Sequence, residues 1–230
     1  MRKITGKQIL VFFSLLALII ALTVASTWLL LWQAELGDFR GLAIVAGFVM
    51  FMYLYAFAVY RAFLFSQPLE VGEIAEGSRA ELTAQVNNLF YLMLFNSLIR
   101  THFLPIPALR LVYLALGARL GPNSYSAGAL LDPPLTQMGA NCIVGHDAVL
   151  FAHIIEGRYL GFAPVILGDD VTVGAMAVVM PDVVIGDGAI VSAGAVVVKG
   201  SRIGPGEVWG GVPAKCLRKP GVQPSDGVVK

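Results

Sequence analysis

Two long apolar runs, separated by a short charged loop, occupy the first part of the chain. Residues 9–32 and 41–60 contain no charged side chain. Each run reaches the roughly 20 residues that a helix needs to cross the core of a bilayer. The pattern therefore predicts a transmembrane helical hairpin within residues 1–65.

A cleaved signal peptide is an alternative for the first run, because Arg2, Lys3 and Lys7 precede it. However, the run continues to Trp32 without a clear cleavage site, and a second run follows directly. These three basic residues and Arg61, which follows the second run, place both ends of the hairpin in the cytoplasm. We therefore expect a multi-pass protein of the inner cell membrane whose remaining chain is cytoplasmic.

Residues 66–119 are predicted to connect the hairpin to the rest of the chain. This connector is acidic at first and then contains an apolar run at residues 89–99, which is too short to span a bilayer. The run predicts a helix that lies in the membrane interface or packs on the hairpin. A second short helix is predicted at 108–116, ended by Gly117. An ordinary buried core helix is an equally good interpretation of these segments.

A repeat with a period of six residues dominates residues 120–219. Aliphatic residues followed by glycine recur in this register, which does not fit the 3.6-residue period of an α-helix. The repeat is typical of a parallel β-helix, in which three hexapeptides form one coil. Residues eighteen apart, such as Leu167, Ile185 and Ile203, should therefore stack. The predicted fold class is mainly β, with a C-terminal β-helix preceded by helices. Residues 220–230 are predicted to be a flexible tail.

Composition narrows the function classes further. The chain has 230 residues, of which 57% are hydrophobic and 13% are charged, and its net charge is +1. This balance lacks the basic excess of a nucleic-acid-binding protein, so no nucleic-acid partner is expected. Two cysteines are too few for a disulfide framework.

The repeat and its closing segment together resemble a known family. The stretch VILGDDVTVGAMAVVMPDVVIGDGAIVSAGAVVVKG, followed by GEVWGGVPAKCLRK, resembles the hexapeptide-repeat acyltransferases. The resemblance implies a left-handed β-helix, a homotrimer and acyl-coenzyme A as co-substrate, with acetyl-CoA favoured and no metal. Basic residues near the C-terminal coils suit the phosphates of coenzyme A, although they could equally be solvated surface charges. The residues expected to contact the donor are Gly174, Ala175, Ala193, Lys199, Arg202, Lys215 and Arg218.

The hexapeptide register breaks between Ile155 and Leu167, which predicts a loop extruded from the coils. His153 precedes this loop, and the resemblance places the catalytic histidine of the family at this position, before a restart that reads PVILGD here. Acyl transfer needs a base to accept the proton of the nucleophile, and histidine suits this role near neutral pH. Glu156 is predicted either to orient His153 or to pair with Arg158.

His146, Arg158 and Asp132 are further candidates for contacts with the acceptor or the loop, although a corner position without chemistry is also open for His146. The segment around His146 is similar to gamma-class carbonic anhydrases, whose zinc spacing would need a histidine at position 151. Phe151 occupies that position, so no metal site is predicted. A non-catalytic trimeric scaffold at the membrane is a different alternative.

The acceptor is inferred from the predicted architecture. A soluble sugar nucleotide would not require a membrane hairpin, whereas a small-molecule or lipid-linked sugar acceptor in the cytosolic leaflet would explain one. The sequence therefore predicts a membrane-anchored O- or N-acyltransferase, with acetyl as the favoured acyl group, that modifies a glycolipid or an envelope polysaccharide precursor.

Overall fold

The computed structural model describes residues 2–32, 34–35, 37–101 and 103–221, and the chain divides into two units. The helical unit comprises residues 2–69 and 75–96, and the β-helical unit comprises residues 70–74 and 97–221. Positions 222–230 of the predicted tail lie outside the described residues.

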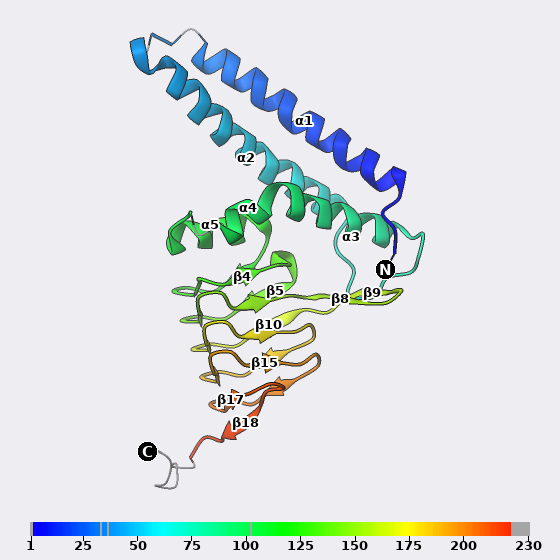
Figure 1. Cartoon of the computed structure of the whole chain (residues 1–230), viewed down its shortest axis with the longest axis vertical. Coiled ribbons are helices and arrows are strands. Elements are labelled where there is room, and N and C mark those ends of the chain that lie inside the picture. The colour runs from blue at the N-terminus through cyan, green and yellow to red at the C-terminus, as the bar shows by residue number, and fades with distance from the viewer. Residues whose placement is uncertain (1, 33, 36, 102, 222–230) are drawn as a thin grey trace. The chain divides into compact units, whose positions relative to one another are not determined.

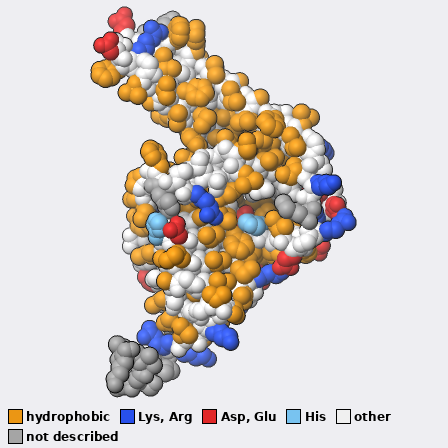
Figure 2. Space-filling view, in the orientation of Figure 1, with side chains coloured by type: hydrophobic (Ala, Val, Ile, Leu, Met, Phe, Trp, Pro, Cys, Tyr) orange, Lys and Arg blue, Asp and Glu red, His pale blue; other side chains and the backbone are white. Residues whose placement is uncertain are grey.

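The helical unit is built around two long apolar helices, α1 (Gly6–Leu31) and α2 (Arg40–Ser66), joined through the short 3-10 helix η1 (Gly37–Phe39). Hydrophobic side chains cover their surface (Figure 2). By length and composition, both helices are long and apolar enough to cross a membrane. The second helix runs six residues beyond the predicted end at residue 60, because the segment after Arg61 remains apolar.

A third helix packs on this pair. It is formed by α3 (Arg79–Phe90), the π-helical segment η2 (Tyr91–Phe95) and α4 (Asn96–Arg100). The ring of Phe90 meets the ring of Phe12 edge-to-face at 5.3 Å, and the hydroxyl of Tyr60 donates to Asn87 at 2.8 Å. The helix starts ten residues before the predicted apolar run, because Ser78 caps it by accepting a hydrogen bond from the backbone N–H of Glu81.

The β-helical unit contains three parallel sheets. Its coils stack along one axis, and successive coils contribute neighbouring strands to each sheet (Figure 1). We name them after their first strands: the β2 sheet, the β3 sheet and the β4 sheet. Leu167 pairs with Ile185 and Ile185 pairs with Ile203, so the predicted eighteen-residue stacking is confirmed. The strands of the β2 sheet are β2 (Arg119–Leu120), β5 (Thr136–Met138), β10 (Val165–Leu167), β13 (Val184–Ile185) and β16 (Arg202–Ile203).

The other two sheets complete each coil. The β3 sheet contains β3 (Tyr125–Ser126), β6 (Ile143–Val144), β11 (Thr172–Val173), β14 (Ile190–Val191), β17 (Val208–Gly210) and the antiparallel β18 (Lys215–Arg218). The β4 sheet contains β4 (Ala129–Leu130), β7 (Val149–Leu150), β12 (Val178–Val179) and β15 (Val196–Val197). Inward residues such as Val144, Leu150 and Val179 are fully buried and form a continuous core.

The helix α5 (Ile106–Leu116) covers the first coil, and Gly117, with a φ of +107°, ends it as the sequence predicts. The hydroxyl of Tyr113 donates to the carbonyl of Gly128 at 2.7 Å. The guanidinium of Arg110 donates to the carbonyls of Ser124 and Gly121 at 2.9 and 3.0 Å. These bonds fix the helix on the first coil.

The insertion in the second coil forms a β-hairpin. Met138 pairs with Leu167, 29 residues later rather than 18, because the strands β8 (His153–Glu156) and β9 (Tyr159–Phe162) leave the coil as an antiparallel pair. The predicted connector contributes a third strand, β1 (Gly72–Glu73), in which Gly72 pairs with Phe162. Phe162 in turn pairs with His153. The strand β9 is therefore paired on both sides, with β1 on one and β8 on the other.

Candidate active site

A buried carboxylate and a partly exposed imidazole meet where the chain leaves the β4 sheet. Asp132 follows β4 and precedes the 3-10 helix η3 (Pro133–Leu135), and His153 begins the hairpin directly after β7. One oxygen of Asp132, Oδ2, accepts hydrogen bonds from the backbone N–H groups of Ala152 and His153 at 2.8 and 3.1 Å. The same oxygen lies 2.7 Å from Nδ1 of His153.

The backbone bonds fix the carboxylate before it meets the ring. The Asp132 side chain is only 6% exposed, whereas that of His153 is 33% exposed. With Nδ1–H donating to Asp132, Nε2 is left as the proton acceptor of the neutral imidazole. The pair therefore has the arrangement that a general base requires, namely an oriented ring with one free basic nitrogen.

The protonation of His153 depends on two opposing effects. Burial of the imidazole lowers its pKa, but the hydrogen bond and negative charge of Asp132 outweigh burial and raise the pKa of His153 above its usual value. The raised pKa strengthens the imidazole as a base once it is neutral. It also requires a higher pH for the ring to lose its proton.

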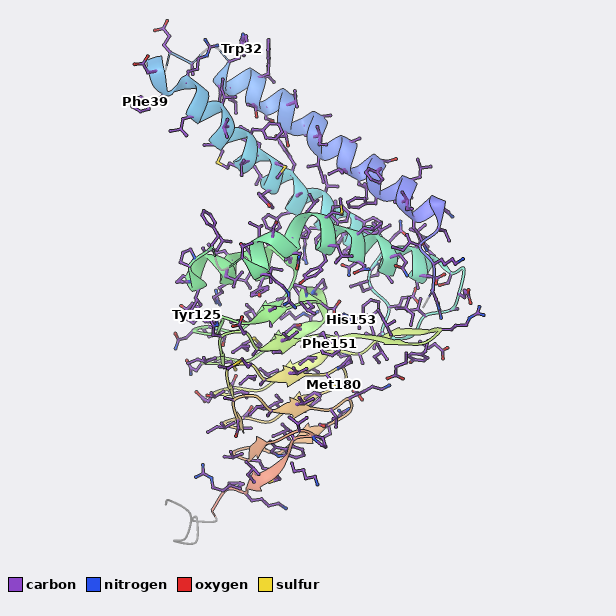
Figure 3. The ribbon with its side chains drawn as sticks, in the orientation of Figure 1. Trp32, Phe39, Tyr125, Phe151, His153 and Met180 are labelled. Atoms are coloured by element: carbon purple, nitrogen blue, oxygen red, sulfur yellow. The ribbon has the colours of Figure 1, made fainter. Side chains whose placement is uncertain are left out.

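An aromatic ring lies beside this imidazole. The ring centroids of Phe151 and His153 are 5.1 Å apart. The backbone N–H of Phe151 donates a hydrogen bond to the carbonyl of Val179 on β12. Met180 is the next residue after that strand. All three labelled side chains lie near the same edge of the coils in Figure 3.

The carboxylate that contacts the imidazole of His153 is that of Asp132, whereas Glu156 pairs with a lysine. The carboxylate of Glu156 lies 3.1 Å from Nζ of Lys199 and is 63% exposed. The same ammonium lies over the ring of Tyr159, 5.9 Å from its centroid. Glu156 and Lys199 therefore link the hairpin to the coil that contains β15, and Arg158 lies exposed in the turn of the hairpin.

We expect Glu156→Gln to change the turnover number by less than about threefold, because an exposed ion pair contributes little free energy and the carboxylate does not touch the imidazole. Steady-state acyl transfer by the purified full chain measures this effect. A loss approaching that of an Asp132 variant would show that Glu156 acts on His153 after all.

His146 lies at a different corner. It precedes β7, whereas His153 follows the same strand. Its Nδ1 lies 2.8 Å from the carboxylate of Asp147, and both side chains are more than half exposed. This matches the corner position that the sequence left open. Among the residues that the structure describes, no three histidine, cysteine or acidic side chains gather as metal ligands.

The residues expected to contact the donor fall in three places. Gly174, Ala175 and Ala193 stack at the corner that leads into the β4 sheet, where a Cβ on Gly174 would lie 2.4 Å from the backbone nitrogen of Ala193. Lys199 follows β15 at the opposite edge of that sheet, and Arg202, on β16 of the β2 sheet, pairs with Asp182 at 2.8 Å. Lys215 and Arg218 are exposed on β18. One chain therefore does not bring the whole set together.

The comparisons with known proteins concern the repeat. The family model "Bacterial transferase hexapeptide (six repeats)" matches residues 164–199. The comparison with curated proteins found no match.

Several solved structures of acetyltransferases are similar to the chain. A galactoside acetyltransferase in complex with coenzyme A is 17% identical, with a TM-score of 0.48, over 64% of this chain and 86% of that one. A hexapeptide-repeat-containing acetyltransferase from Vibrio cholerae, complexed with acetyl coenzyme A, is 24% identical, with a TM-score of 0.41, over 44% of this chain and 60% of that one. A serine acetyltransferase from Neisseria gonorrhoeae is 20% identical, with a TM-score of 0.40, over 86% of this chain and 69% of that one.

Proposed function

We propose that this chain is a membrane-anchored acyltransferase that moves an acetyl group from acetyl-CoA to a hydroxyl or amine of an amphiphilic acceptor. The observation that carries the proposal is the contact between His153 and the buried carboxylate of Asp132. The match of residues 164–199 to a transferase repeat supports the same reaction class.

The reaction follows from the position of the basic nitrogen. Nε2 of His153 accepts the proton of the acceptor hydroxyl while the hydroxyl oxygen attacks the carbonyl carbon of the thioester. The tetrahedral adduct then expels the coenzyme A thiolate, which takes the proton back from the imidazolium. The products are an ester and free coenzyme A, or an amide where the nucleophile is an amine. Asp132 holds the ring in place and stabilises its transient positive charge.

We further propose a left-handed β-helix and a homotrimer whose subunits meet on the outer face of the β4 sheet. Val149, Val178 and Val196 point outward in register on this face and are half-buried. By contrast, the outward positions of the β2 sheet include Arg119, Gln137 and Arg202.

A neighbouring subunit would also complete the donor site. The corner at Gly174 lies at one edge of the β4 sheet, and His153 lies at the other edge. Four extended residues cross the sheet between these edges, which corresponds to a separation of about 13 Å. In a groove between two subunits, the Gly174 corner of one subunit can lie next to His153 of another. Within one chain, these two edges stay apart.

The substitution Val178→Arg should convert the trimer to monomers, because it places a charge at the centre of the proposed interface. Val184→Arg is the matched control, since Val184 is also half-buried and outward-facing but lies on the central part of the β2 sheet. Light scattering of the full chain in detergent gives the mass. Trimers of Val178→Arg would contradict the proposed interface.

Acceptor and donor can be identified together. The full chain in lipid nanodiscs would be incubated with a panel of acyl-CoA donors and membrane lipid extract, and the lipids would be analysed by mass spectrometry. The proposal predicts a lipid-linked sugar or glycolipid that gains 42 mass units per acetyl group, as the replacement of H by C₂H₃O requires, only with acetyl-CoA and only when His153 is intact. Absence of transfer with every donor would instead favour the non-catalytic scaffold.

A further inference from the structure

The helix that covers the first coil is apolar on both its inner and its outer side. On the inner side of α5, Leu109, Tyr113 and Leu116 are buried. On the outer side, Leu111 is 65% exposed and Ile106 is 45% exposed. A helix on the surface of a water-soluble domain normally presents polar residues outward. The outer side of α5 therefore requires a different explanation.

The one charged residue of α5 does not relieve this exposure. Arg110 donates hydrogen bonds to the carbonyls of Ser124, Leu120 and Gly121, so its guanidinium is directed at the first coil. Phe103, which lies just before the helix, is 82% exposed and extends the apolar surface. We name the surface formed by Phe103, Ile106 and Leu111 the cap face.

The charge around the cap face indicates its partner. Residues 82–131 contain no aspartate or glutamate and three arginines. Two of these, Arg100 and Arg119, are exposed and lie in the sequence on either side of the cap face. An apolar surface flanked by arginines suits the interface of an anionic leaflet, where apolar side chains enter the acyl boundary and cations attract lipid phosphates.

We propose that the cap face lies on the anionic surface of the membrane, so that the β-helical unit itself binds lipid in addition to any anchoring by α1 and α2. The inference rests on the proposed membrane attachment. It goes beyond that attachment because a hairpin anchor alone would leave the β-helix free to face any direction.

This contact with the membrane would determine which acceptor hydroxyls reach His153, because it fixes the distance of the base from the lipid surface. The helix α5 packs against η3, which follows Asp132 directly. Asp132 belongs to the first coil and His153 to the second, and neighbouring coils are about 4.8 Å apart. The base therefore lies one or two coil spacings from the cap, within reach of a headgroup sugar on the same leaflet.

The matched pair Leu111→Cys and Leu217→Cys tests the inference, because both leucines are 65% exposed and they lie on opposite ends of the β-helix. Both are made in a Cys216→Ala background, and the remaining cysteine, Cys142, is fully buried. The full chain is labelled with an environment-sensitive fluorophore and reconstituted into vesicles of phosphatidylcholine with phosphatidylglycerol. Nitroxide-labelled lipids and aqueous iodide serve as the two quenchers.

We expect a blue-shifted emission at Leu111→Cys that is quenched by the nitroxide lipids and protected from iodide, with the opposite result at Leu217→Cys. Replacing phosphatidylglycerol by phosphatidylcholine should weaken the shift at Leu111→Cys. Iodide quenching at both positions would overturn the inference. Protection from both quenchers at Leu111→Cys would overturn it too, because it would show that protein, either α2 or a second copy, covers the cap face.

Acyl transfer by the same labelled proteins separates this inference from the proposed function. His153-dependent transfer with a cap face that does not touch lipid would refute the lipid contact alone. Loss of transfer in every form of the chain would instead refute the proposed function.

Discussion

His153→Ala is expected to lower the turnover number for acyl transfer roughly 10²–10⁴-fold, which is the usual contribution of a positioned base. The loss follows because Nε2 of His153 accepts the proton of the nucleophile in the proposed reaction. The substitution removes a side chain that is one-third exposed, so the coils and the helical unit should remain folded. Steady-state rates at saturating acetyl-CoA and acceptor would measure the change.

The control for this variant is His146→Ala. His146 is also an imidazole next to a carboxylate, but it is more exposed and lies before β7 rather than after it. Its removal should leave the rate nearly unchanged. Near-normal turnover by His153→Ala would defeat the mechanism, and a large loss in His146→Ala would transfer the role of base to that residue.

The pH dependence provides a second readout for the same variant. Because a base must be neutral, the rate of the native chain should rise with pH as His153 loses its proton. Asp132 raises the pKa of His153, so the midpoint of this rise should lie above the usual value for histidine. The rise should be absent in His153→Ala. A native profile without it would contradict the assignment even if the rate of the variant were low.

The β-helix could be predicted because its coils repeat a single physical requirement. Each strand sends an aliphatic residue inward, and glycine at the corner lets the next coil approach; at Gly186, for example, a Cβ would lie 2.7 Å from the backbone nitrogen of Pro205. The extruded loop was visible as an interruption of that register. The strand β1 was not predictable, because its two residues pair only with the hairpin and carry no pattern of their own.

The start of the third helix was also hidden in the sequence. The connector is acidic in sequence, yet Glu81 is buried and lies 3.0 Å from Arg2. A charged residue in that environment depends on a partner 79 positions away. Such a distant partner leaves no local signal in the pattern of hydrophobic and polar residues, so the sequence predicts the helix only over its apolar run.

The partner of His153 was concealed by a shift in the repeat. Leu120 pairs with Met138, eighteen residues later, but Leu130 pairs with Leu150, twenty residues later. The corner before β7 is therefore two residues longer than the corner before β4. A strict eighteen-residue count aligns Asp132 with Leu150 instead of with the backbone of Ala152. The sequence therefore offers only Glu156, the nearer acidic residue, as a partner for His153, with pairing to Arg158 as its alternative.

Asp132→Asn is the substitution that separates orientation from mere packing. It keeps the size of the side chain but removes the charge, and its amide can present an N–H toward Nδ1 and favour the wrong tautomer of His153. We expect a loss of turnover between roughly 10² and 10⁴-fold, comparable to the loss of the base itself. The Michaelis constant for acetyl-CoA should change little, because Asp132 is buried behind the ring.

The pH profile distinguishes this loss from a folding defect. Removing the negative charge removes the effect that raises the pKa of His153, while burial still lowers it. The residual activity of Asp132→Asn should therefore rise at a lower pH than that of the native chain. Asp132→Glu, which keeps the charge but alters its position, should retain the higher midpoint with a reduced rate. An unchanged midpoint in Asp132→Asn would mean that the carboxylate only supports the backbone of Ala152 and His153, and the proposed pair would then no longer explain the chemistry.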